Sequence, residues 1–105
     1  MKSKKSLNYF QQGDVLVKPT TIPEDAKPLT HRIFREGEHT GHMHAATAED
    51  VVLLEKDGVM FARIPNGTNL THQEHHTIFL PPGDYQIDAV QEYDHFLEES
   101  RAVLD

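Results

Sequence analysis

Short apolar runs separated by turn-forming residues recur along the chain and predict β-strands rather than helices. The clearest pattern is the pair of runs 51–54 and 59–64, which flank Asp57-Gly58 and indicate a β-hairpin. Further extended segments are predicted over residues 15–18, 29–35, 42–47, 77–80 and 84–90.

The last of these segments alternates most regularly between apolar and polar positions. Tyr85, Ile87 and Ala89 share one face of a strand over residues 84–90. No long stretch has the 3.6-residue period of an amphipathic helix, and short strands with turns about every 8–12 residues are typical of all-β proteins. The sequence therefore predicts an all-β fold, either a small barrel or a sandwich of short antiparallel strands.

The chain has 105 residues and contains no internal repeat, so residues 1–105 are expected to form a single domain. This length excludes doubly wound dinucleotide folds and eight-fold α/β barrels. Lysines at positions 2, 4 and 5 predict that residues 1–8 form a flexible basic tail. The acidic segment 91–105 is expected to be a solvated surface.

Charge and apolar content restrict the partners and the compartment. Ten basic residues against seventeen acidic ones give a formal net charge of −7, which disfavours nucleic-acid backbones and anionic membrane surfaces. No window approaches the roughly 20 apolar residues of a transmembrane helix, and residues 6–14 lack the apolar run of a secretory signal. We expect a cytoplasmic protein with no nucleic-acid partner and no membrane partner.

The eight histidines are clustered rather than scattered. Six of them lie in two short segments, 39–44 and 72–76. With no cysteine in the chain, any metal ion has to be held by nitrogen and oxygen donors, and clustered imidazoles near carboxylates suit iron, manganese, nickel or zinc. The sequence therefore predicts a site for one divalent metal ion. His31 and His95 are isolated and are interpreted as ordinary surface or core residues.

The spacing within the first cluster favours a shared ion. His42 and His44 are two residues apart, so both imidazoles project from the same face of a strand. Glu49 follows five residues later and can approach the pair after a bend. Gly41 permits a turn that would swing His39 toward the same place.

The second cluster offers a further ligand. His75 and His76 are adjacent and face opposite sides of a strand, so at most one of them is expected to join the site. His72 is able to reach inward independently. The third imidazole is thus His72 or His75, and Glu74 is an alternative to Glu49 as a fourth ligand or general base.

At these residues the chain resembles the cupins. Their first motif is similar to Gly37, His42-Met43-His44, Glu49 and Gly58, and their second is similar to Gly58, Pro65-Asn66-Gly67 and His72. The resemblance implies a small β-barrel that holds one divalent metal through His42, His44, Glu49 and His72. It also implies a homodimer.

The chain is also similar to a group of small uncharacterised bacterial proteins. Three tracts carry this likeness: Gly41-His42-Met43-His44, the run from Leu70 to His75, and Leu80-Pro81-Pro82-Gly83-Asp84-Tyr85 continuing to Gln91-Glu92-Tyr93. The likeness implies no activity, but it joins both histidine clusters in one pattern and keeps His75 beside His72 as a candidate.

The preferred interpretation is a metal-binding, cupin-like β-barrel with an open coordination position for water or a small-molecule substrate. The sequence assigns no reaction, so enzyme status stays open. One alternative is a non-catalytic ligand-binding module with a closed coordination shell. The other is an interaction protein whose histidines line a dimer interface without metal.

Overall fold

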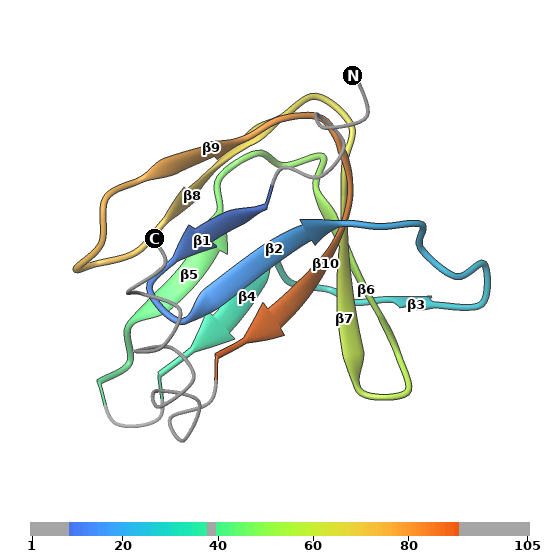
Figure 1. The fold of residues 1–105 in the computed structure, drawn as a ribbon, viewed down its shortest axis with the longest axis horizontal. Coiled ribbons are helices and arrows are strands. Elements are labelled where there is room, and N and C mark those ends of the chain that lie inside the picture. Colours follow the sequence, from blue (N-terminus) through green and yellow to red (C-terminus); the bar gives the residue numbers. More distant parts are fainter. Residues whose placement is uncertain (1–8, 38–39, 91–105) are drawn as a thin grey trace, which may run out of the picture.

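The computed structural model describes residues 9–37 and 40–90, which form ten β-strands and their connections (Figure 1). The strands are β1 Phe10–Gln12, β2 Val15–Pro19, β3 Lys27–Pro28, β4 Ile33–Glu36, β5 Met43–Ala46, β6 Val52–Lys56, β7 Val59–Ile64, β8 Thr68–Thr71, β9 Ile78–Leu80 and β10 Gly83–Ala89. The described residues contain no helix, so none there is long and apolar enough to cross a membrane.

The strands form two antiparallel sheets. The larger sheet has the order β1-β2-β10-β7-β6-β3, and the smaller has the order β4-β5-β8-β9. In Figure 1 the strands β4 and β5 lie behind β2 and β10, and the core contains side chains from both sheets. The prediction of an all-β fold is confirmed. Of the two architectures, the molecule has the sandwich, because its described strands do not close into a barrel.

Alternating side chains fill the space between the two sheets. The larger sheet contributes the main buried apolar groups Val15, Val17, Leu53, Ala62, Ile64, Tyr85 and Ile87, and the smaller sheet contributes Phe34, Ala46, Leu70 and Leu80. The predicted apolar face of β10 is confirmed at Tyr85 and Ile87, which are both buried. This burial of apolar surface is the main source of stability for a sandwich.

The predicted hairpin is also confirmed. Strands β6 and β7 pair antiparallel from Val52 opposite Arg63 to Lys56 opposite Val59. Asp57 and Gly58 have φ angles of +52° and +80°, as a type I′ turn requires at both central positions.

A second small core covers the outer face of this hairpin. It contains Ile22, Ala26, Leu54 and Phe61. Apolar residues on both faces of β6 and β7 explain why these two segments are nearly continuous apolar runs rather than alternating ones.

Four segments differ from the expectations. The strands β1, β3 and β8 are not predicted from the sequence, because they carry mostly polar residues or proline. The strand expected over 29–35 is only β4 (Ile33–Glu36), because the backbone N–H of Leu29 instead donates to Leu53 in the other sheet, at 2.7 Å. The predicted tails, residues 1–8 and 91–105, lie outside the described residues.

The alternation along β6 gives a stability test. Leu53 is 0% exposed in the main core, whereas its neighbour Val52 is 38% exposed. Leu53→Ala should lower the free energy of unfolding by about 2–5 kcal/mol, because it deletes buried methyl groups and leaves a cavity. Urea unfolding measures this change. Val52→Ala is the matched control and should cost less than about 1 kcal/mol; equal losses in both variants would contradict the described register.

Candidate functional site

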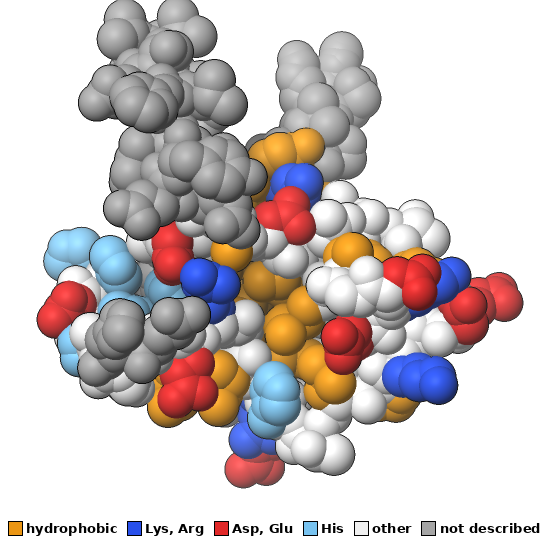
Figure 2. Space-filling view, turned by 90° about the horizontal axis from the view of Figure 1, so that it is seen from below, with side chains coloured by type: hydrophobic (Ala, Val, Ile, Leu, Met, Phe, Trp, Pro, Cys, Tyr) orange, Lys and Arg blue, Asp and Glu red, His pale blue; other side chains and the backbone are white. Residues whose placement is uncertain are grey.

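Four imidazole rings gather where the β1–β2 turn meets one end of the smaller sheet. His44 lies in β5 and His42 directly precedes that strand, while His72 and His75 belong to the connection between β8 and β9. In Figure 2 most of the histidine side chains collect at one end of the molecule, and one lies apart from them. Antiparallel pairing of β5 with β8 brings these two sequence clusters together, because Ala45 stands opposite Thr71.

The rings contact one another directly, with His72 at the centre. Its ring centroid lies 4.2 Å from that of His44, 4.5 Å from that of His75 and 5.6 Å from that of His42. The His44 and His75 rings are 5.9 Å apart and nearly parallel. We call these four residues the histidine cluster.

The amide of Gln12 fixes the orientation of His44. This side chain is 3% exposed, and its Nε2 donates to the carbonyl oxygens of Leu70 and His76, at 2.8 Å each. Its Oε1 therefore faces the His44 ring and lies 2.8 Å from Nδ1. Since an amide oxygen only accepts, Nδ1 of His44 carries the proton of the neutral ring. Nε2 then presents a lone pair.

That lone pair faces a carboxylate. Oδ1 of Asp14 lies 3.2 Å from Nε2 of His44, and the other carboxylate oxygen, Oδ2, accepts a hydrogen bond from Nε of Arg35 at 3.0 Å. Partial burial raises the pKa of Asp14, but the hydrogen bond and charge of Arg35 lower this pKa by a larger amount. The net shift is downward, and the carboxyl is ionised. Two acceptor atoms thus face each other, and a cation between them would make the contact attractive.

A proton is a poor occupant of this position. Burial and the charge of the neighbouring His72 lower the pKa of His44 by more than the charge and hydrogen bond of Asp14 raise it, so the net shift is downward. Burial and the neighbouring His75 and His42 likewise lower the pKa of His72. Imidazoles packed this closely disfavour one another's protonation, so the lowered pKa values keep His44 and His72 neutral near pH 7.

Two further contacts hold the edges of the histidine cluster. Gly13, in the β1–β2 turn, has a φ of +58°, and a Cβ there would lie 2.5 Å from Nε2 of His75. The ring of His75 therefore covers a position where only glycine fits. On the opposite side, Oε2 of Glu74 lies 3.6 Å from Nδ1 of His42.

The structure brings together four of the five residues predicted to bind metal: His42, His44, His72 and His75. It places Glu49 elsewhere. Beyond β5 the chain runs along β8 away from His72, since Thr47 bonds to Asn69 and Ala48 to Thr68. Glu49 follows in the exposed turn before β6, at the other end of this ladder.

The remaining histidines have other positions. His76 contributes its backbone carbonyl to Gln12, and its ring is exposed. His31 is exposed, and its Nδ1 accepts a hydrogen bond from the backbone N–H of Ile33. His39 and His95 lie outside the described residues.

Gln12 and Asp14 were not predicted as site residues. Their only sequence signal is the turn-forming Gly13 between them, which indicates a bend but not what the bend faces. Their role depends on the docking of β1 against the smaller sheet, which no local pattern specifies.

The side chains are not arranged as a closed coordination shell. Within residues 9–37 and 40–90, no three histidine, aspartate or glutamate side chains have donor atoms placed to hold one metal ion together. The rings instead pack tilted against one another, with interplanar angles of 36° between His44 and His72 and 48° between His72 and His75.

Comparison with known proteins gives one match. A family model described as "Domain of unknown function (DUF8820)" matches residues 11–89, a span that contains Gln12, Asp14 and all four rings of the histidine cluster. No curated protein and no solved structure matches the chain significantly.

The Gln12 amide gives a test of this arrangement. Gln12→Leu should lower the free energy of unfolding by about 1–3 kcal/mol, because it leaves the Leu70 and His76 carbonyls and the His44 N–H without their partner. Urea unfolding measures the loss, and long-range ¹H–¹⁵N NMR reports whether His44 keeps its proton on Nδ1. The control is Gln11→Leu, at an exposed position on the other face of β1. A His44 tautomer that is unchanged in Gln12→Leu would contradict the assignment.

The lowered pKa values of His44 and His72 predict how stability depends on pH. Above the ordinary histidine pKa of 6.5 both rings are neutral in the folded and unfolded chains. As the pH falls below 6.5, the unfolded chain takes up protons first, so the free energy of unfolding should decrease until the folded rings also protonate. Urea unfolding between about pH 7.5 and pH 5 measures this slope.

Replacing a clustered ring is the control for this pH effect. The decrease below pH 6.5 should be smaller in His44→Gln and unchanged in His31→Gln, whose ring lies outside the histidine cluster. The opposite trend, with stability rising as the pH falls through this window, would show that the folded rings bind protons more tightly than the unfolded ones.

Proposed function

The chain belongs to the family described as "Domain of unknown function (DUF8820)", and since that family brings no assigned activity, we propose a function from the site itself: the histidine cluster binds one divalent transition-metal ion. The observation that carries this proposal is the pair of acceptor atoms, Nε2 of His44 and Oδ1 of Asp14, that face each other at 3.2 Å.

The separation of these two atoms suits a shared ion. Zinc bonds of about 2.0–2.1 Å to nitrogen and 2.0–2.2 Å to oxygen, at a tetrahedral angle, place two donor atoms about 3.3–3.5 Å apart, close to the observed separation. The hydrogen bond from Nδ1 of His44 to Gln12 is the kind of outer contact that orients a metal-bound imidazole and fixes its tautomer.

The other rings supply the further ligands. The ring centroids of His72 and His75 lie 4.2 Å and 5.9 Å from that of His44, so in this proposal these two side chains rotate to turn a nitrogen toward the ion. His42 packs edge-on against His72, with ring centroids 5.6 Å apart, and is a further candidate ligand. In this proposal Asp14 takes the place that the cupin resemblance gave to Glu49, and the coordination is cupin-like in its use of imidazoles on and beside neighbouring strands.

The donor set restricts the ion and its chemistry. Imidazole with one carboxylate suits iron, nickel, zinc and manganese, and thiolate ligands are excluded because the chain has no cysteine. Two or three imidazoles with Asp14 would leave a position for water or a small molecule, as catalytic sites have. Glu74, beside His42, is then the nearest carboxylate to act as a general base.

Elemental analysis of the protein purified without a histidine tag, followed by zinc titration of the metal-free chain at pH 7.5, tests the proposal. We expect about one equivalent of metal in the wild type. His44→Ala, His72→Ala and Asp14→Asn should each weaken zinc binding at least about tenfold, since a lost ligand or orienting partner typically costs 10–100-fold in affinity.

The matched control is His31→Ala, which removes an exposed imidazole outside the histidine cluster and should bind zinc as the wild type does. Equal loss in His31→Ala would indicate binding to scattered surface histidines. A wild type that binds no zinc, nickel, iron or manganese after reconstitution would refute the proposal and favour the alternative in which these histidines line a protein interface.

A further inference from the structure

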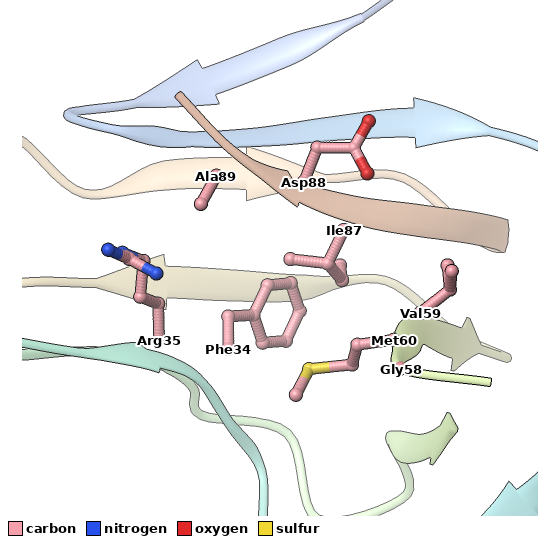
Figure 3. Close-up of a pocket in the computed structure, with 8 residues that line it drawn as sticks. All are labelled: Phe34, Arg35, Gly58, Val59, Met60, Ile87, Asp88 and Ala89. Carbon is pink, nitrogen blue, oxygen red and sulfur yellow. The ribbon is translucent and has the colours of Figure 1, made fainter. Parts of the chain in front are cut away.

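A pocket lies beside the histidine cluster, between the two sheets. Its volume is about 250 Å³. Figure 3 shows apolar side chains meeting across it, with Phe34 from β4 on one side and Ile87 from β10 and Met60 from β7 on the other. Two charged residues, Arg35 and Asp88, also line it. A ligand held there would contact the apolar side chains of Phe34, Met60 and Ile87, with Arg35 at one end, whereas the carboxylate of Asp88 lies on the other side of β10 from Ile87 (Figure 3).

An irregularity in β4 creates this combination of apolar and charged walls. Ile33 pairs with Ala45 and Arg35 pairs with His44, which are adjacent in β5. Phe34 therefore has no partner in β5 and forms a β-bulge. On a regular strand, consecutive side chains point to opposite faces, but the bulge allows both Phe34 and Arg35 to line the pocket. β-bulges are enriched beside functional sites, where they redirect a side chain.

The two charged residues differ in their unused hydrogen-bonding capacity. Oδ2 of Asp88 lies 2.6 Å from Nζ of Lys18, and its Oδ1 accepts a hydrogen bond from Gln86 at 2.9 Å. Arg35 has five N–H donors, and among the described residues only Nε has a partner, Asp14. The unused hydrogen-bond donors at this pocket are therefore the N–H groups of the Arg35 cation, and an anionic acceptor group on a ligand would complement them.

We propose that this pocket binds a small monocarboxylate with an apolar body. Its carboxylate would accept hydrogen bonds from the terminal nitrogens of Arg35, in the paired geometry that guanidinium and carboxylate groups favour. Its hydrocarbon chain would pack between Phe34, Met60 and Ile87. The pocket is smaller than the roughly 300–1,000 Å³ of sites for drug-sized ligands, so the ligand is small.

This binding site goes beyond the metal site and does not require an ion. Asp14 connects the two, because its carboxylate contacts His44 through one oxygen and Arg35 through the other. The salt bridge to Asp14 holds the guanidinium at the end of the pocket, so the group that would receive the carboxylate is already positioned.

Methyl NMR of the full chain, treated with a chelator and kept free of metal, tests the proposal with hexanoate as the probe. The ¹³C-labelled methyl group of Met60 should shift in a saturable way as hexanoate is added, while that of Met43, outside the pocket, should not. Hexanamide has the same carbon chain without the charge, and should bind at least about tenfold more weakly, since a hydrogen bond to a charged group is stronger than a neutral one.

Substitution of the guanidinium completes the test. Arg35→Gln should reduce hexanoate affinity at least about tenfold, to the level of hexanamide, and the control Arg32→Gln, an exposed arginine that does not line the pocket, should leave it unchanged. No shift of Met60 with hexanoate, equal affinity for hexanoate and hexanamide, or undiminished binding in Arg35→Gln would each overturn the proposal. If Arg35→Gln does not fold, the comparison of the two probes on the native chain still decides.

Discussion

The buried amide of Gln12 is the polar contact on which the arrangement of this site depends. It belongs to the edge strand of the larger sheet, and all three of its hydrogen bonds run to the smaller one: to His44, to the carbonyl of Leu70 and to the carbonyl of His76. An apolar residue at position 12 would join the two sheets equally well but leave three polar groups unpaired. The packing of the sandwich therefore also sets the orientation of an imidazole.

Asp14 extends this arrangement from the cluster to the pocket. The turn that follows Gln12 is only two residues long, so the amide and the carboxylate are held close to each other on one side of β1 and β2. One carboxylate oxygen faces His44 and the other faces Arg35. A cation bound at His44 would therefore change the electrostatic field at Arg35, and an anion bound at Arg35 would change the field at His44. The proposed metal site and the proposed carboxylate site are adjacent, but neither requires the other to be occupied.

The sequence predicts those features that local chemistry determines. The Asp57-Gly58 turn, the alternation around Ile87 and the apolar runs of the hairpin all correspond to observed strands. The two histidine-rich segments, 39–44 and 72–76, also come together, since the rings of His72 and His75 contact that of His44.

Long-range docking explains what the sequence did not predict. Glu49 has motif-like spacing, but the β5–β8 ladder carries it away from the rings. Gln12 and Asp14 are ordinary polar residues beside a turn, and they acquire a role only because β1 lies against the other sheet. The bulge at Phe34 depends on the pairing of β4 with β5, which a single strand does not encode.

The wide spread of the site along the chain has a consequence for how it forms. Gln12 is 32 positions from His44 and 64 positions from His76, so these contacts require segments far apart in the chain, and both sheets, to meet. Contacts of such long sequence separation form slowly, because the loop has to close before they contribute any stability. A nascent chain would thus carry exposed imidazoles with no preferred tautomer. Under the proposed function, the site would become selective for its ion only once the two sheets have packed together, which favours loading of the folded protein over capture during synthesis.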